Sequence, residues 1–224
     1  PAERAVRLPD DISFETAAAV MLKGLTAQCL VRRTHRVQPG DTVLIHAAAG
    51  GVGLLLVQWA KRIGATVIAT AGNDEKAELV RAHGADHVIV YTRENFTERT
   101  RALTNGRGVD VVYDSVGRAT FLGSLDSLRP LGLMVSFGNA SGKVEPFDIG
   151  LLAQKGSLFL TRPMLFTYIA RREDLLAMAE ELFAAIRQGW LDVKIGQRFP
   201  LSQAAEAHRA LESRRTIGAT LLLP

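Results

Sequence analysis

A short glycine-rich stretch carries residues whose types and spacing could bind a phosphate group. Residues 42–47 are apolar and partly β-branched, which predicts a buried strand, and Gly50 and Gly53 follow just before an amphipathic run. This order of strand, tight turn and helix places backbone N–H groups at a helix N-terminus, where they attract anions. The stretch therefore predicts a site for the diphosphate of a dinucleotide.

The small residues of this loop have the spacing of a dinucleotide fingerprint, with Ala48, Gly50 and Gly53 at its three glycine positions. Ala48 would allow the turn, Gly50 would let backbone N–H groups approach the diphosphate, and Gly53 would let the helix pack closely on the strand. A plain strand-to-helix turn is the alternative, because turns use glycine freely. We expect cofactor contacts from Ala49, Gly50, Gly51, Val52 and Gly53.

The end of the second predicted strand indicates which nicotinamide cofactor the site prefers. Domains that bind NAD place an Asp or Glu about 20 residues past the loop, on the ribose hydroxyls. Here residues 66–71 form the strand and Gly72 ends it, with no acid in place. Lys76 follows closely enough to pair with a 2′-phosphate, which favours NADPH. Asp74 is interpreted as the N-cap of a helix that runs to His83.

Alternating strands and helices must position these groups. Strands are expected at residues 42–47, 66–71, 88–91, 109–113, 132–137 and 157–160, with helical patterns between several of them. Because βαβ crossovers are almost always right-handed, this alternation predicts an α/β fold of the Rossmann type. We expect a doubly wound parallel sheet of about six strands in the order 3-2-1-4-5-6.

The segments that flank this sheet have their own patterns. Ser13 is a candidate N-cap for a short helix through Met21, and a second helix is expected over residues 26–36. Residues 174–188 are amphipathic and stop at Gly189, and Ser202 is expected to cap a further helix. Residues 217–223 predict a last strand, and the apolar side chains of Leu221, Leu222 and Leu223 would be uncovered or paired elsewhere if a domain that they pack on is missing.

Composition excludes several classes of protein. The chain has 224 residues, is 47% hydrophobic and carries a net charge of +4 with one cysteine, Cys29. The sequence contains no run of about 18 uncharged apolar residues, so it predicts no membrane-spanning helix. The single cysteine fits a reducing compartment, so we expect a cytoplasmic protein. Basic residues are scattered, with short clusters such as Arg32, Arg33 and Arg36, which favours a solvated surface over a nucleic-acid interface.

Searches for metal and nucleophile motifs predict no metal site and no catalytic residue in this chain. The five histidines and Cys29 lack the spacing of zinc ligands, and no Gly-x-Ser-x-Gly motif is present. His46, on the first predicted strand, is interpreted as a core or strand-end histidine with satisfied hydrogen bonds. Hydride transfer needs no protein nucleophile, because the reduced nicotinamide carries the reactive hydrogen.

A larger block of residues resembles the quinone oxidoreductase and zeta-crystallin branch of the medium-chain dehydrogenases and reductases. The matching residues are Gly40, Asp41, Leu44, Ala48, Ala49, Gly50, Gly51, Gly53, Gln58 and Lys61. The resemblance implies reduction of quinones by NADPH without metal. Zinc-dependent relatives place a cysteine ligand near the position of Lys23, and this departure also argues against a metal.

The resemblance implies further cofactor contacts. Thr26 would lie near the nicotinamide, with a helix N-cap as the simpler alternative. Tyr91 and Arg214 would lie beside the adenosine phosphate, although a strand-end aromatic and a solvated charge need no cofactor. Ribose and nicotinamide contacts would come from the ends of three strands. These are Ser115, then Phe137, Gly138 and Asn139, and finally Arg162, with loop and core roles as alternatives for Ser115 and Phe137.

The resemblance also implies an organisation. Residues 1–24 would be the joint to a GroES-like catalytic domain that this chain lacks, residues 25–166 the NADPH-binding domain, and residues 167–224 helices and a strand that pack toward the catalytic domain. Related reductases pair the sixth strand across a dimer, so a homodimer through residues 157–160 is expected.

Three functions are compatible with these patterns. The first is an NADPH-dependent quinone reductase, whose quinone contacts lie outside this chain. The second is an enoyl reductase of the same superfamily, which would differ in the acceptor cleft. The third is a scaffold that binds a nucleotide or RNA without turnover.

Overall fold

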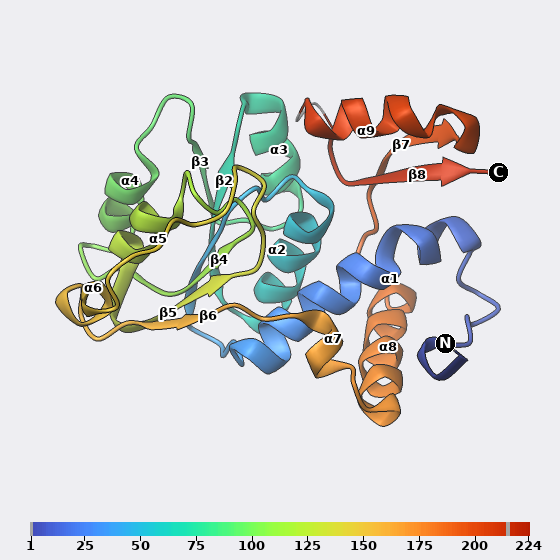
Figure 1. The fold of residues 1–224 in the computed structure, drawn as a ribbon, viewed down its shortest axis with the longest axis horizontal. Helices are drawn as coiled ribbons and strands as arrows, with labels where there is room; N and C mark the ends of the chain where they lie inside the picture. Colours follow the sequence, from blue (N-terminus) through green and yellow to red (C-terminus); the bar gives the residue numbers. More distant parts are fainter. Residues whose placement is uncertain (1, 214–215) are drawn as a thin grey trace.

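A six-stranded parallel sheet forms the centre of the computed structural model, which describes residues 2–213 and 216–224 (Figure 1). The strand order is β3-β2-β1-β4-β5-β6. The strands are β1 (Thr42–Ile45), β2 (Thr66–Ala71), β3 (His87–Val90), β4 (Val109–Asp114), β5 (Leu128–Ser136) and β6 (Phe159–Thr161). The predicted fold class and strand order are therefore confirmed, and the strand ends move by a few residues.

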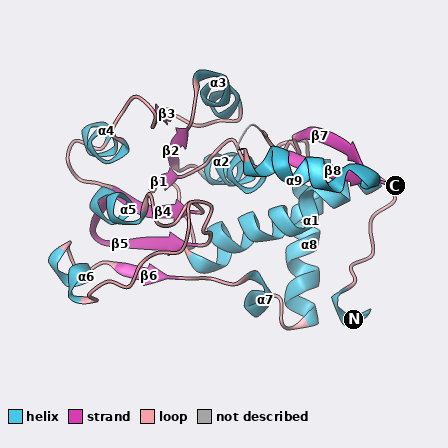
Figure 2. Cartoon of the chain, turned by 45° about the horizontal axis from the view of Figure 1, so that its top comes forward, coloured by secondary structure: helices cyan, strands magenta, loops and turns pink. Residues whose placement is uncertain are grey.

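Helices cover both faces of this sheet, as a buried parallel sheet requires (Figure 2). Val43 and Ile45 of β1 belong to one core, and Leu44 between them belongs to the other. The first core contains residues of α1 (Phe14–Cys29), α2 (Gly51–Ile63), α3 (Asp74–Ala82) and α8 (Arg172–Arg187). The second is covered by α4 (Phe96–Leu103), α5 (Phe121–Ser127) and α6 (Gly150–Gln154).

One long helix, α1, replaces the two short helices that the sequence predicted at the N-terminal end. Ser13 caps it as expected, because its hydroxyl oxygen accepts the Thr16 N–H at 3.1 Å. Gly24 does not break the helix. It serves as a contact point, since a Cβ there would lie 2.6 Å from Leu182 Cδ1 on α8. A π-helical turn, η2 (Leu30–Thr34), continues α1 toward the sheet.

The C-terminal part forms a separate two-stranded parallel sheet beside α1 (Figure 1). Its strands are β7 (Ile195–Pro200), which the sequence did not predict, and β8 (Ala219–Leu223). Leu221 packs near Ala19 of α1 and is only 4% exposed, whereas Leu222 is 40% exposed, so the apolar side chains of this strand are partly covered and partly left open. The remaining elements are η1 (Ala2–Arg4), α7 (Leu165–Tyr168), η3 (Leu201–Gln203) and α9 (Ala204–Glu212).

Two predicted helix caps are wrong. Asn73 caps α3, because its side-chain oxygen accepts the Lys76 N–H at 2.9 Å, and Asp74 is the first residue of the helix. Ser202 does not cap α9, which continues from the short turn η3 without a side-chain cap. The predicted stop at Gly189 is confirmed by its left-handed φ of +72° after α8.

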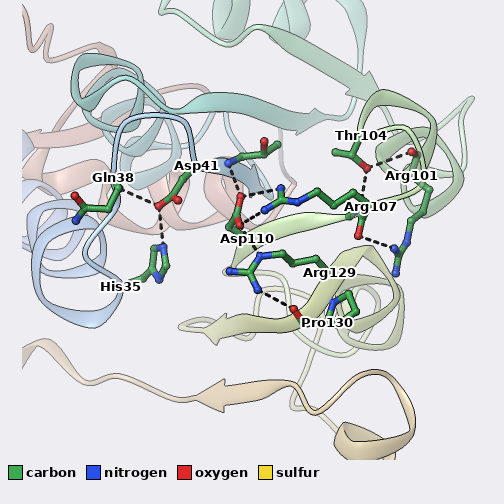
Figure 3. Close-up of polar contacts among 11 residues, drawn as sticks. His35, Gln38, Asp41, Arg101, Thr104, Arg107, Asp110, Arg129 and Pro130 are labelled. Atoms are coloured by element: carbon green, nitrogen blue, oxygen red, sulfur yellow. Dashed lines mark hydrogen bonds and ion pairs between the residues drawn. The ribbon is translucent and has the colours of Figure 1, made fainter.

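Asp110 joins the amino ends of three strands (Figure 3). Its carboxylate accepts the Thr42 N–H of β1 at 2.8 Å and pairs with Arg107 and Arg129, each at 2.6 Å. Burial raises the pKa of this carboxyl, but the hydrogen bonds from both arginines and from Thr42 outweigh it and lower the pKa to about 2. The end of the sheet opposite the glycine loop is thus held by one ionised side chain.

Candidate cofactor-binding site

The glycine loop joins β1 to α2 through a turn over residues 46–49, which includes Ala48 as predicted, and the strand before it ends two residues earlier than predicted. Ala47 has a left-handed φ of +50°, a conformation that is uncommon for a residue with a side chain. Ala48, which the sequence assigned to the turn, is buried and donates its N–H to the Thr70 carbonyl at 3.1 Å. The Gly50 N–H closes the turn on the Ala47 carbonyl at 3.0 Å.

Gly53 packs α2 closely against this loop, as predicted. A Cβ at Gly53 would lie 2.5 Å from the Ala47 carbonyl oxygen, a distance that side chains do not adopt. Gly50 is the N-cap residue of α2 and has no side chain to bond the first turn. The N–H groups of Gly51, Val52 and Gly53 belong to that turn and have no partner within the helix. The loop therefore presents hydrogen-bond donors to an anion at the positive end of a helix.

A cavity of about 400 Å³ opens beside the loop, at the carboxyl ends of β1 and β2. Ligands of open α/β sheets bind at this edge. Segments that follow β4 and β5 line the opposite wall, including Val116 and Ser141, and Thr216 of the tail also contributes. The predicted site residues that line the cavity are Ala49, Gly50, Gly72, Lys76 and Tyr91.

No carboxylate is found among the described residues that line this cavity. Asp74, the nearest acid after β2, binds Arg93 instead, with Oδ2 accepting an N–H at 2.9 Å. Hydrogen bonding to Arg93 lowers the pKa of Asp74, so this carboxylate stays ionised and engaged. Gly72 leaves room for Tyr91, since a Cβ there would lie 2.9 Å from the Tyr91 hydroxyl. This composition fits an anionic group better than ribose hydroxyls that need an acid.

The other predicted contacts gather at the ends of β4, β5 and β6. Arg162 donates to the carbonyl oxygens of Ser136 and Gly138, at 3.0 and 2.9 Å. A Cβ on Gly138 would overlap the Ser115 carbonyl, so the loops after β4 and β5 touch there. Phe137 packs against the core on the α1 side of the sheet. Ser115, Phe137, Gly138, Asn139 and Arg162 thus lie at one sheet edge but do not line the 400 Å³ cavity.

Two further predicted contacts come from helix α1 and from the C-terminal part of the sequence. Thr26 is not a helix N-cap, because α1 begins at Phe14 and the Thr26 hydroxyl donates to the Leu22 carbonyl at 2.7 Å. Arg214 lies outside the described residues. The tail next to it does reach the loop, since the Gly218 N–H donates to the Ala49 carbonyl at 3.0 Å.

A buried histidine in the wall of the cavity belongs to a polar network that the sequence did not reveal. His46 is 2% exposed, with Nδ1 3.0 Å from the Thr70 hydroxyl and Nε2 3.1 Å from the Ser124 hydroxyl. Ser124 donates its proton to Asp114, so its oxygen accepts from Nε2–H and Nδ1 accepts from Thr70. Burial lowers the pKa of His46, despite the opposing charge of Asp114. The interpretation as a satisfied buried histidine is confirmed.

Asp114 extends this network to the far wall of the cavity. Its Oδ1 accepts the N–H groups of Val116 and Gly117, at 2.7 and 3.0 Å, and Oδ2 accepts the Thr120 hydroxyl at 2.7 Å. The network therefore fixes the loop after β4 relative to the first two strands. The sequence feature that could have indicated this network is an Asp at a strand end followed by a turn that contains Gly117.

Within the described parts of the chain, no group of three or more His, Cys, Asp or Glu side chains could hold a metal ion. Cys29 is buried, and this burial raises the pKa of its thiol, which disfavours a reactive thiolate. No described helix has both the length and the apolar character needed to span a bilayer.

Comparison with known proteins places this geometry in a family. The family model for zinc-binding dehydrogenases matches residues 51–182. A quinone oxidoreductase of Pseudomonas aeruginosa is 54% identical over 222 residues, which are 99% of this chain and 68% of that protein. A 2-haloacrylate reductase of Burkholderia sp. is 46% identical over 230 residues, covering all of this chain and 68% of that protein.

A solved structure of a quinone oxidoreductase is also similar to this chain. The crystal structure of Escherichia coli quinone oxidoreductase complexed with NADPH has a TM-score of 0.97 and 50% identity, and the match covers all of this chain and 69% of that one. The residues described here do not fit the zinc of the family model's name, because no ligand group is present. The chain belongs to the quinone oxidoreductase branch of the medium-chain dehydrogenase/reductase superfamily.

Proposed function

We propose that this chain is the nucleotide-binding part of an NADPH-dependent quinone reductase. The observation that carries the proposal is the cavity beside the glycine loop, which is lined by Lys76 and Tyr91 and by no carboxylate among the described residues. Relatives that are 50 to 54% identical are quinone oxidoreductases, and one of them was solved with NADPH.

The residues of this chain bind and orient the cofactor in the proposed reaction. NADPH, when bound, supplies a hydride to the quinone. The N–H groups at the start of α2 hold its diphosphate, and Lys76, Tyr91 and Arg214 hold its 2′-phosphate. Thr26, Ser115 and the residues at the ends of β5 and β6 line the path to the nicotinamide. Because the cofactor carries the reactive hydrogen, we assign no catalytic residue to this chain.

A second candidate function is the reduction of an electron-poor carbon–carbon double bond. The observation that favours it is the 46% identity to a 2-haloacrylate reductase. Both reactions use the same cofactor site, so NADPH oxidation with a quinone or with 2-chloroacrylate as acceptor distinguishes them. NADPH binding with turnover of neither acceptor would favour the third function, a nucleotide-binding scaffold.

Titration of the chain with NADPH and NADH tests the phosphate contacts. We expect NADPH to bind more tightly, and Lys76→Ala to weaken NADPH binding about tenfold or more while it changes NADH binding little. Lys61→Ala is the control, because Lys61 pairs with Asp86 in the last turn of α2, far from the cavity. Equal affinities for the two cofactors, or an unchanged preference in Lys76→Ala, would refute the assignment.

We also propose the domain division at residues 24 and 166, a cytoplasmic location and a homodimer. Support for the dimer comes from β6, which among the described strands pairs only with β5 and leaves Phe159 60% exposed at the sheet edge. Sedimentation at tens of micromolar should give a dimer, and Phe159→Lys should shift it to monomer. A monomeric unaltered chain would remove the dimer from the proposal.

A further inference from the structure

Lys23 on α1 meets the glycine loop at the first residue of α2. A Cβ on Gly51 would lie 2.5 Å from Lys23 Cδ and 2.8 Å from its Cε, so the lysine stem lies directly over the bare Cα of Gly51. The same Cβ would lie 3.1 Å from the carbonyl oxygen of Gly218. The first helix, the loop and the tail therefore converge at the first turn of α2, whose N–H groups have no partner within the helix.

The ammonium group of Lys23 has no ion-pair partner among the described residues. Burial alone lowers the pKa of Lys23, and no ion pair or hydrogen bond with a described residue offsets it. By contrast, Lys61 pairs with Asp86 and Lys155 pairs with Asp126. The ammonium of Lys23 also lies near the positive end of the α2 dipole, where a second positive charge is unfavourable. An anion between the two would relieve both costs.

We propose that Lys23 contacts the diphosphate of the bound dinucleotide, together with the N–H groups at the start of α2. The inference rests on the proposed cofactor site and adds a contact that the fingerprint lacks. It assigns the two lysines different tasks, because the diphosphate is common to NADPH and NADH, whereas the 2′-phosphate near Lys76 is present only in NADPH. Lys23 thus binds the part of the molecule that both cofactors share.

Gly51 has a matching role in this arrangement. The sequence placed it among the loop contacts without a separate function, whereas the structure shows that its missing side chain makes room for the stem of Lys23. A methyl group there would push the stem away from the loop. Gly51→Ala therefore perturbs the same contact from the opposite side.

Calorimetric titration of the whole chain with NADPH, NADH, ADP and adenosine tests the proposal. Lys23→Met keeps the length of the stem and removes the charge. We expect it to weaken NADPH, NADH and ADP by similar factors, about 10- to 100-fold, since hydrogen bonds to charged groups contribute at that level. Adenosine, which has no phosphate, should bind as before. Lys23→Arg should restore most of the affinity.

The controls separate the contact from general effects. Lys61→Met removes the same charge from the other end of α2 and should leave all four affinities unchanged. Lys23→Met should melt no lower than the unaltered chain, because a half-buried charge is lost. If it does melt lower, the contact is tested instead by introducing Gly51→Ala into the unaltered chain and into the Lys23→Ala chain. Its effect on NADH binding should be smaller when Lys23 is absent.

Each outcome bears on one of the two proposals. Unchanged NADPH and NADH binding by Lys23→Met, or loss of NADPH binding alone, would overturn the role of Lys23 and leave the cofactor site standing. Failure of the unaltered chain to bind either dinucleotide would overturn both.

Discussion

Replacing Asp110 with asparagine tests whether one buried carboxylate holds the amino ends of three strands together. The Asp110 side chain is 5% exposed and bonds Arg107, Arg129 and the Thr42 N–H. Asparagine keeps the size and one acceptor for the Thr42 N–H, but it removes the charge that both arginines bind. The substitution therefore isolates the electrostatic part of the junction.

The magnitude follows from the pKa of Asp110, which falls from 3.8 to about 2 on folding. A lowered pKa in the folded state stabilises the protein above the unfolded value and is lost as the pH falls through the folded one. The shift corresponds to about 2 kcal/mol at neutral pH, and the exposure of Arg107 reduces this to about 1 to 2 kcal/mol. About half of that contribution should remain at pH 3.

Urea unfolding of the two proteins at pH 7, 5 and 3 measures this dependence. We expect Asp110→Asn to lower the free energy of unfolding by about 1 to 2 kcal/mol at pH 7 and 5, and by about half as much at pH 3. Asp10→Asn, at an exposed aspartate, should change stability by less than about 0.5 kcal/mol. A difference between wild type and Asp110→Asn that stays constant or grows from pH 5 to pH 3 would refute the reasoning.

Further predictions concern the loop and the histidine beneath it. Gly53→Ala should lower the melting temperature by roughly 2 to 12 °C in calorimetry, because its Cβ would meet the Ala47 carbonyl at 2.5 Å and overpacking costs about 1 to 3 kcal/mol. Gly150→Ala, where the nearest atoms belong to the Asp148 side chain, should change it little, and equal effects would contradict the packing argument. The His46 ring should titrate by NMR below the 6.5 of a free imidazole, because burial lowers its pKa. Stability should accordingly fall as the pH drops below 6.5, since only the unfolded state takes up the proton. An imidazole midpoint above 6.5 would contradict this.

The sheet could be predicted because its pattern is local. Each strand is a short apolar run, and the handedness of crossovers leaves few ways to order six of them. The glycine loop was equally local, since Gly53 and its strand lie within a dozen residues. The strand ends at Ile45, two residues earlier than predicted, because Ala47 adopts a left-handed conformation that its residue type disfavours.

The errors arose where distant segments decide the outcome. Gly24 looks like a break between helices, and only its contact with Leu182, far along the chain, explains why α1 continues. Strand β7 has little apolar alternation and depends on β8 for its hydrogen bonds. In the sequence, Lys23 stood out only because zinc-dependent relatives have a cysteine ligand near this position. The role proposed for it here depends on its contact with Gly51, which is distant in the sequence.

The bridge between Gly50 and Gly218 ties the last strand to the loop through one backbone hydrogen bond. A ligand bound at the loop is therefore coupled to the order of residues 216–224. Amide protons of β8 should exchange more slowly when the dinucleotide is present. For the same reason, ending the chain before Thr216 or attaching a bulky tag there should weaken the binding of the dinucleotide.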